Sequence, residues 1–241
     1  TNLSRHHAAS STKAYSQTLD WALRMVLLIA VPAAAALMLL AEPILATLFL
    51  YGDVMTARDM TMATYSLRAY SLGLVAFMLI KVLAPGFFAR QDMRTPVRIG
   101  VIAMVSNMFL NLLFVVPLHH YWQVGHVGLA LATSISAFLN AGLLCYALRK
   151  KAIYLPSRSW LRFMVNLVAA VAAMVAVLVL TANQFDALNT QVWQQLSWWQ
   201  RSGGIALVCS AGFGVYIAVL WMTGMRPADL RGPAKATSRE H

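Results

Sequence analysis

The sequence has little charge and few carboxylates. Only 11% of the 241 residues are charged, and Asp and Glu together number 8. A water-soluble domain usually carries about a quarter charged residues. The 60% hydrophobic content is correspondingly high. These proportions exclude an ordinary soluble globule and favour a membrane protein.

Cysteines and catalytic motifs are also scarce. The two cysteines, Cys145 and Cys209, stand in separate apolar runs, so we expect small buried packing residues rather than a disulfide or metal site. We find no phosphate-binding glycine loop, no nucleophile paired with a base and no zinc-ligand spacing. No carboxylate falls deep in an apolar run. The sequence therefore predicts a protein that is not an enzyme and needs no cofactor of its own.

Long apolar runs predict an all-α membrane protein. Runs of about 20 residues are long enough to cross the hydrocarbon core of a bilayer. Six transmembrane helices are expected, at Trp21–Leu40, Thr61–Phe88, Arg98–Leu118, His126–Leu148, Trp160–Ala182 and Gly203–Gly224.

Most of the basic residues lie in alternate connections between these spans. In a soluble protein a net charge of +11 would suggest a nucleic-acid partner. Here the positive-inside rule explains it better, so we expect no nucleic acid and place both termini in the cytoplasm. The first residue is Thr1, and the polar segment 1–20 reads as a connector, so we expect a piece of a longer protein. The basic residues on the cytoplasmic side are Arg5, Lys13, Arg24, Arg90, Arg94, Arg98, Arg149, Lys150, Lys151, Arg158, Arg162, Arg226, Arg231, Lys235 and Arg239.

The second span carries the two basic side chains predicted to lie inside the membrane, Arg68 and Lys81. A charge exposed to lipid is costly, so such residues usually face a cavity or a partner. For Lys81 this interpretation is favoured over a side chain that extends to the headgroups. For Arg68, near the outer end of the span, the interfacial position is favoured.

Prolines interrupt two of the spans. Pro85 removes the hydrogen bond that the Lys81 carbonyl would accept, and Gly86 follows it, so we expect the helix to bend beside the ammonium group. Pro32 leaves the Leu28 carbonyl free in the middle of the first span and predicts a kink. A static kink is the simpler interpretation; a hinge at Pro32, Pro85 and Gly86 is the functional alternative.

Polar side chains recur at helical spacing in the third and fourth spans. They either hydrogen-bond one helix to the next or line a wet path that holds a cation such as Na⁺. The absence of a carboxylate weakens the ion site. The last span carries a row of small residues, Ala206, Ser210 and Gly214, which predicts close packing between the last two spans. The polar residues are Asn107, Asn111, Thr133, Ser136 and Asn140.

The run KVLAPGFFARQDMRTPVRIG, from Lys81 to Gly100, closely resembles a segment of the MurJ (MviN) family of bacterial lipid II flippases. This family belongs to the MATE-like exporter superfamily. The stretches LSRHHAA, DWALRM, LFLYGDV and GLALATSISAFLNAGLL support the resemblance in the expected order. The match extends from Leu3 to about Arg158, and the last two spans agree in hydropathy and position.

The resemblance implies the C-terminal part of a transporter with fourteen spans. Residues 1–20 would be a cytoplasmic connector, 21–150 the last four helices of the second lobe, 151–225 an additional helix pair, and 226–241 a cytoplasmic tail. The expected partners are lipid II (undecaprenyl-pyrophosphate-linked glycan), membrane lipids of the bacterial inner membrane, and the preceding helices of the same protein.

The resemblance also implies site residues. Lys81 matches a lysine of the family's cationic cavity, and Arg24, Arg68 and Arg90 are the arginines expected to join it around the pyrophosphate. Asn107 and Asn111 would be polar cavity residues. Some members bind Na⁺ near positions equivalent to Asn107, Asn111 and Thr133. Because this chain has Asn111 where some relatives have a carboxylate, the sodium site is in doubt.

Three functions remain open from the sequence. The first is lipid II flipping by alternating access, driven by the membrane potential or an ion gradient. The second is export of another lipid-linked oligosaccharide or of drugs, although drug exporters favour acidic cavity residues. The third is a membrane scaffold of a cell-wall complex that transports nothing.

Overall fold

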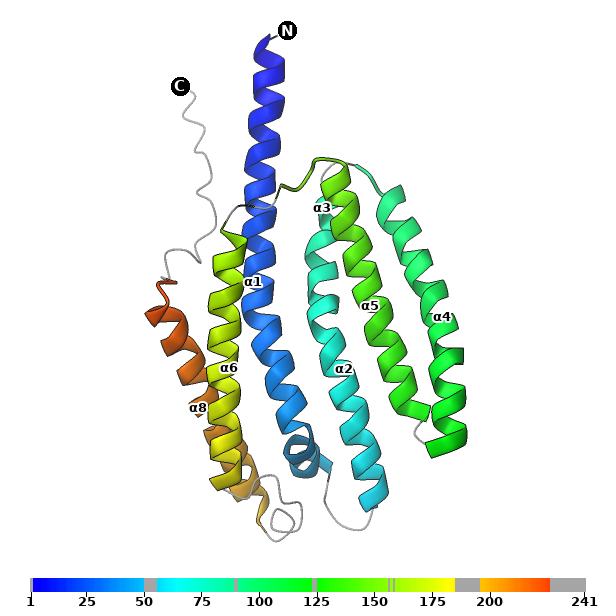
Figure 1. Cartoon of the computed structure of the whole chain (residues 1–241), viewed down its shortest axis with the longest axis vertical. Helices are drawn as coiled ribbons and strands as arrows, with labels where there is room; N and C mark the ends of the chain where they lie inside the picture. The colour runs from blue at the N-terminus through cyan, green and yellow to red at the C-terminus, as the bar shows by residue number, and fades with distance from the viewer. Residues whose placement is uncertain are drawn as a thin grey trace.

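The protein is a bundle of long helices (Figure 1). The structure is a computed structural model that describes residues 2–49, 56–88, 91–122, 125–155, 157, 159–184 and 196–225, with only the backbone described for 2–13, 57, 121 and 122. Its helices are α1 (Asn2–Phe49), α2 (Ala57–Leu83), α3 (Pro85–Phe88), α4 (Arg94–Trp122), α5 (Gly125–Lys150), α6 (Trp160–Gln184) and α8 (Trp198–Met222).

The prediction of six spans is confirmed. In the described part of the chain, six helices are long and apolar enough to cross a membrane. Helices α1, α4, α5 and α6 contain the whole of their predicted runs, whereas α2 and α8 begin earlier than predicted and end earlier, at Leu83 and Met222. The largest difference is in α1, which is helical from Asn2 and continues to Phe49 through Pro32 and Pro43. The expected connector, residues 1–20, is therefore helical almost throughout; the division of the chain into four parts stays a prediction.

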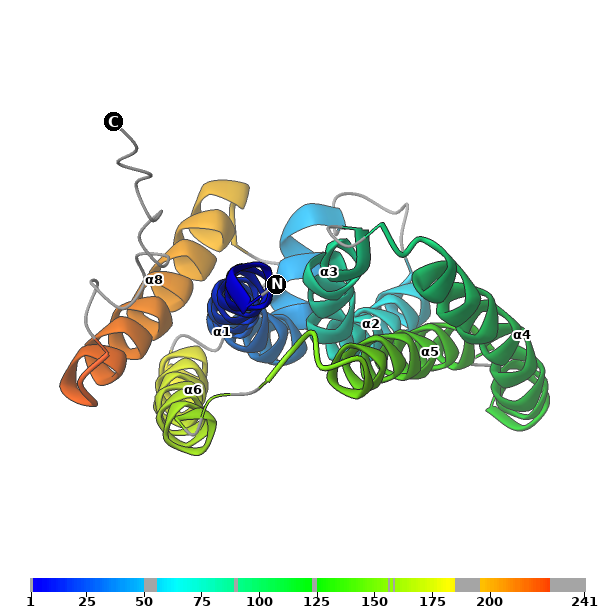
Figure 2. The ribbon, with the colours of Figure 1, turned by 90° about the horizontal axis from the view of Figure 1, so that it is seen from above.

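The helices form a curved row, seen from above in Figure 2. Neighbours in the row are α1 and α2, α2 and α5, then α5 and α4, so α4 lies at one edge. At the other side, α6 and α8 pack on each other and on α1, which confirms the predicted pairing of the last two spans. Because the row from α1 to α4 is a single helix thick, α4 leaves many apolar side chains exposed, such as Met104, Phe109 and Leu112.

The helix assignment is interrupted beside Pro85, where a bend is predicted, but Ala84 keeps helical backbone angles, so the bend itself stays a prediction. Helix α2 ends at Leu83, and the short α3 begins at Pro85. The hydroxyl of Tyr15, from α1, donates to the Gly86 carbonyl at 3.0 Å. The apolar cluster around this break contains Leu83, Phe87 and Leu148. The turn is therefore held by packing and by a hydrogen bond from a distant part of the chain.

Two predictions about buried side chains are wrong. The face of α8 that packs against α6 carries Val208, Gly212 and Tyr216, whereas the predicted row of small residues lies largely on the exposed side. Cys209 is exposed and Cys145 is only partly buried. The errors at Cys209 and in the row of small residues arise because α8 is apolar all round, so hydropathy does not say which of its faces meets a partner. Cys145, on α5, packs at the edge of an apolar cluster.

Candidate functional site

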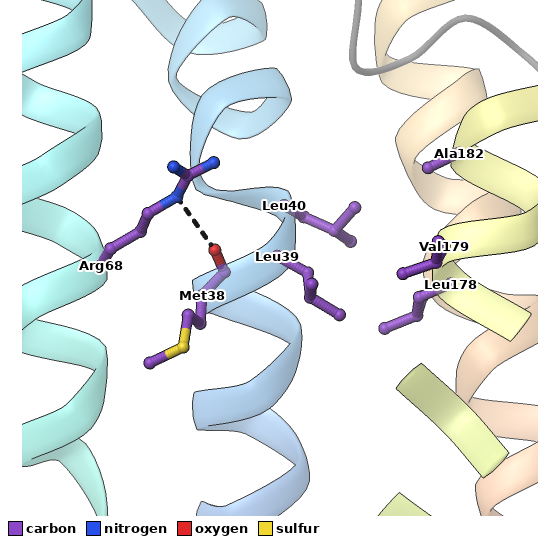
Figure 3. A pocket seen from close by; sticks show the side chains of 7 residues that line it. All are labelled: Met38, Leu39, Leu40, Arg68, Leu178, Val179 and Ala182. Carbon is purple, nitrogen blue, oxygen red and sulfur yellow. Dashed lines mark hydrogen bonds between the residues drawn. The ribbon is translucent and has the colours of Figure 1, made fainter. Parts of the chain in front are cut away.

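A pocket of about 350 Å³ lies beside α1, between α2 and α6 (Figure 3). Arg68 reaches it from α2, and its Nε donates to the Met38 carbonyl of α1 at 3.2 Å. The remaining walls are apolar. Such a chamber accommodates hydrocarbon, and a guanidinium can pair with a phosphate oxygen. The lining residues are Met38, Leu39, Leu40, Arg68, Leu178, Val179 and Ala182.

Lys81 lies elsewhere on α2. Its side chain is exposed, one turn before the break at Pro85. It does not line the pocket at Arg68, from which it is separated by about 20 Å along the helix. The structure therefore does not bring the two intramembrane cations into one site. Whether Lys81 faces a cavity in the whole protein stays a prediction.

Arg24, on α1, lies in a third place, next to the start of α6. Its Nε lies 3.0 Å from a carboxylate oxygen of Asp20, one turn earlier in α1. Its Nη2 donates to the Ser159 hydroxyl at 2.8 Å. The guanidinium also lies 5.4 Å from the ring centroids of Trp160 and Phe163, within the range of a cation–π contact. Arg24 thus joins α1 to α6 as well as being a candidate for the substrate site.

Asp20 is the centre of this cluster, and the sequence analysis missed it. Its carboxylate accepts hydrogen bonds from Trp160 Nε1, from the Tyr154 hydroxyl at 2.9 Å and from Ser157. Burial and the adjacent Asp20 carboxylate raise the pKa of Tyr154 well above its ordinary value. The i, i+4 spacing of Asp20 and Arg24 was the available signal. Nothing in the sequence pointed to the tyrosine and tryptophan.

The polar stripe between α4 and α5 is a hydrogen-bonded network. Asn107 donates to the Ser136 hydroxyl at 2.9 Å and to Thr133 at 3.5 Å. Asn111 donates to the Asn107 side-chain oxygen at 2.8 Å. These bonds join the two helices, as the structural interpretation of the stripe predicts.

Oxygen atoms are suitable ligands for Na⁺, but none of the side chains in this network carries a negative charge. Hard cations prefer oxygen ligands, and the side-chain oxygen of Asn111 is buried with no hydrogen-bond partner among the described residues. The donors Asn107, Asn111 and Thr133 are all neutral. Within the described part of the chain, no three His, Cys, Asp or Glu residues gather where they could hold a metal ion.

The remaining predicted site residues are less informative. Arg90 lies outside the described residues. Pro32 lies inside the continuous helix α1, and Pro85 and Gly86 form the break already described. Arg201, which was not a predicted site residue and precedes the predicted last span, is 6% exposed at the start of α8. Its guanidinium donates to the Ala46 carbonyl of α1 at 3.5 Å.

Six spanning helices with cations and amides held between them define an α-helical, multi-pass membrane protein. The family model described as lipid II flippase MurJ matches residues 1–195. The chain belongs to the MurJ family.

Two relatives are similar in sequence to nearly the whole of this chain. The probable lipid II flippase MurJ of Vibrio cholerae is 44% identical over 231 residues, which are 95% of this chain and 41% of that protein. The lipid II flippase MurJ of Burkholderia cenocepacia is 40% identical over 237 residues, 97% of this chain and 43% of that protein. This chain thus spans about two-fifths of the length of these relatives.

A solved structure shares the fold. The lipid II flippase MurJ in an inward closed conformation superposes with a TM-score of 0.65 at 22% identity, covering 87% of this chain and 39% of that chain. The arrangement of the described helices is therefore that of the MurJ, MATE-like fold.

Proposed function

We propose that this chain is the C-terminal part of a flippase that moves lipid II, the undecaprenyl-pyrophosphate-linked cell-wall precursor, across the bacterial inner membrane. The observation that carries the proposal is the identity of 44% and 40% to named MurJ proteins along 95% and 97% of the chain. No covalent chemistry is needed, so the protein is a transporter and not an enzyme.

The transported headgroup is an anion, and the cations of α1 and α2 are its proposed ligands. Lys81 and Arg68 stand inside a span, where a charge without a polar partner is costly. Arg24 and Arg90 would meet the pyrophosphate from the cytoplasmic side. The apolar pocket beside Arg68 offers room for part of the prenyl chain.

Movement of the lobes would reopen the cavity on the other side of the membrane, with bending at Pro32, Pro85 and Gly86. The membrane potential or a sodium gradient would set the direction. Asn107, Asn111 and Thr133 are the residues that would hold Na⁺, through amide and hydroxyl oxygens.

The distribution of cations supports an orientation with both termini in the cytoplasm. The end of the bundle with the start of α4 and the end of α5 carries exposed basic side chains, among them Arg94, Arg149 and Lys150, whereas the start of α2 carries Arg58. The positive-inside rule assigns the richer end to the cytoplasm. The exposed apolar side chains of α4 suit lipid tails, or contact with the part of the longer relatives that this chain does not span.

Replacement of Lys81 tests the proposal. The natural protein that carries this chain is expressed in a strain depleted of its own flippase, as wild type, Lys81→Ala and, as a matched control, Lys150→Ala. Lys150 is also an exposed lysine, but it lies at the end of α5. We expect wild type and the control to restore growth and Lys81→Ala to fail at equal expression, with a rate of lipid II flipping in vesicles at least tenfold lower.

The outcomes separate the rival functions. Growth with Lys81→Ala at the wild-type rate would remove Lys81 from the mechanism. Restored growth without any lipid II flipping by the wild-type protein in vesicles would favour the scaffold. Flipping of a different lipid-linked oligosaccharide, with lipid II left in place, would favour the other exporter.

A further inference from the structure

Helix α1 is tied to the α6–α8 pair at three levels along its length. At the start of α6, Trp160 Nε1 donates to the Asp20 carboxylate of α1. At the start of α8, Arg201 donates to the Ala46 carbonyl of α1 at 3.5 Å. Between these two, the Tyr216 hydroxyl of α8 donates to the Leu28 carbonyl at 2.8 Å, in a buried hydrogen bond. The hydrogen bond from Tyr216 differs from the other two because the Leu28 carbonyl has lost its donor within the helix.

The Leu28 carbonyl is free because of Pro32. In a helix the carbonyl of residue 28 accepts from the amide of residue 32, and proline has no amide hydrogen. Helix α1 nevertheless continues through this position. The phenol of Tyr216 occupies the place of the missing donor, from a helix 188 residues further along the chain.

The described side chains around the Leu28 carbonyl are apolar and offer it no other hydrogen-bond donor. Tyr216 is 3% exposed and Leu28 is 8% exposed. Both belong to an apolar cluster that also contains Leu167, Met174 and Leu220. A buried carbonyl without a donor costs free energy, and an apolar cluster holds no water to replace the phenol. Separation of α8 from α1 therefore carries a penalty located at the proline.

We propose that Tyr216 is a positioning residue that latches α1 at Pro32, so that α1 bends at this point only when α8 releases it. The latch makes the additional helix pair a control on the movement of α1. The local coupling between Tyr216 and Pro32 is independent of the transported substrate, whereas its effect on transport rests on the proposed function.

A double-mutant cycle tests the latch. The natural protein is prepared in lipid nanodiscs as wild type, Tyr216→Phe, Pro32→Ala and the double variant. Tyr146→Phe is the control, because Tyr146 is 64% exposed on α5. Pro32→Ala supplies the missing amide, so the Leu28 carbonyl no longer depends on the phenol. The measurement is hydrogen–deuterium exchange of the α1 amides on either side of position 32.

Tyr216→Phe should speed this exchange about fivefold, since the loss of a buried hydrogen bond leaves the carbonyl unpaired. In the Pro32→Ala background the same change should have less than a twofold effect, and Tyr146→Phe should have none. Unchanged exchange in Tyr216→Phe, or an equal increase in both backgrounds, would overturn the latch.

Flipping of lipid II by the same samples tests the link to transport. We expect Tyr216→Phe to change the rate at least threefold and Pro32→Ala to suppress that change. Altered exchange with an unaltered flipping rate would refute control of transport by the latch. Absence of flipping by the wild-type protein would instead refute the proposed function, while the exchange result would still decide the local coupling.

Discussion

The contact between α4 and α5 and the contact between α6 and α8 solve the same packing problem differently. Gly128 brings α5 against the backbone of α4, where an added Cβ would lie 2.9 Å from the Phe114 carbonyl carbon. Gly212 brings α8 against the side chain of Leu178, where an added Cβ would lie 2.6 Å from a methyl carbon. The first contact also carries the hydrogen bonds of Asn107, whereas the second is apolar around Gly212 and has a hydrogen bond from Asn166 only at the end of α8.

The difference follows from the geometry of hydrogen bonds. Side-chain bonds between helices, such as the 2.9 Å contact between Asn107 and Ser136, need backbones that approach closely. A glycine facing backbone provides that approach. Apolar packing needs only complementary shape, and a leucine can change rotamer to restore it. The α4–α5 contact should therefore be rigid and the α6–α8 contact adaptable.

The largest expected effect comes from adding a methyl group at each contact. Gly128→Ala should lower the free energy of unfolding by about 2 kcal/mol, because backbone cannot move aside. Gly212→Ala should lower it by only about 1 kcal/mol, because the displaced atoms, Cδ2 and Cγ of Leu178, belong to a side chain and not to backbone. Thermal unfolding of the natural protein in detergent micelles measures both.

Two glycines without neighbours serve as controls. An added Cβ at Gly142 of α5 or at Gly214 of α8 would meet nothing within 4 Å. Alanine should stabilise the helix at both positions by about 0.5 kcal/mol. A loss at Gly212→Ala equal to that at Gly128→Ala would contradict the distinction between a rigid and an adaptable contact.

A smaller effect is expected from the polar network. Asn107→Leu removes the bonds to Ser136 and Asn111 and should lower the free energy of unfolding by about 1 kcal/mol. Asn140→Leu is the matched control. Asn140 belongs to the α5 side of the same polar stripe, and its replacement should change the free energy of unfolding little. Thermal unfolding in sodium and in potassium buffers distinguishes the two interpretations of the stripe.

Sodium decides the outcome of that comparison. If Asn107 helps to hold Na⁺, sodium raises the melting temperature of the wild type and not that of Asn107→Leu. If the network only joins helices, the two buffers give the same values for every variant. Equal stability of Asn107→Leu and Asn140→Leu would remove the network from the account of the α4–α5 contact.

The smallest effect belongs to the ion pair at the end of the same contact. Lys151, just after α5, pairs with Asp92, just before α4. Hydrogen bonds from Lys151 and Thr95 lower the pKa of Asp92 to about 2 from its ordinary 3.8. A lowered carboxyl pKa stabilises the fold above the ordinary pKa, and this contribution disappears as the pH falls from about 4 to about 2.

Asp92→Asn should therefore melt slightly below wild type at pH 6, and the difference should shrink below pH 4. Lys151→Met should lower the melting temperature at pH 6 by about as much as Asp92→Asn. The double variant should melt no lower than either single variant. A difference between wild type and Asp92→Asn that grows on acidification would show the opposite sign and refute the assignment. No matching effect is expected at the α6–α8 contact, because no ion pair among the described residues joins these two helices.

The spans and the break were predictable because their signals are local. Apolar length fixed the six helices, and the missing amide of Pro85 fixed the interruption after α2. The packed face of α8 was not predictable, since Val208, Gly212 and Tyr216 look no different in hydropathy from their neighbours. Asn107 and Asn111 could be identified as polar residues between helices, but their partners could not.

The same limit applies to the charged residues. Pattern alone identified Arg68 and Lys81 as unusual, and the family resemblance added Arg24. Neither could show that Arg24 has Asp20, Trp160 and Phe163 beside it. These partners come from segments far apart in the chain. Arg68 and its pocket likewise depend on how α1, α2 and α6 meet.

By itself, the sequence determined that the chain crosses the membrane as helices, how many spans it has, where prolines weaken them and to which family it belongs. These properties follow from hydrocarbon thickness, backbone chemistry and sequence identity, all of which can be evaluated from the order of residues alone. Only the tertiary structure decided which donor reaches the carbonyl freed by Pro32 and which glycine faces backbone. Those outcomes depend on the approach of helices that are distant in sequence, and no local pattern records that distance.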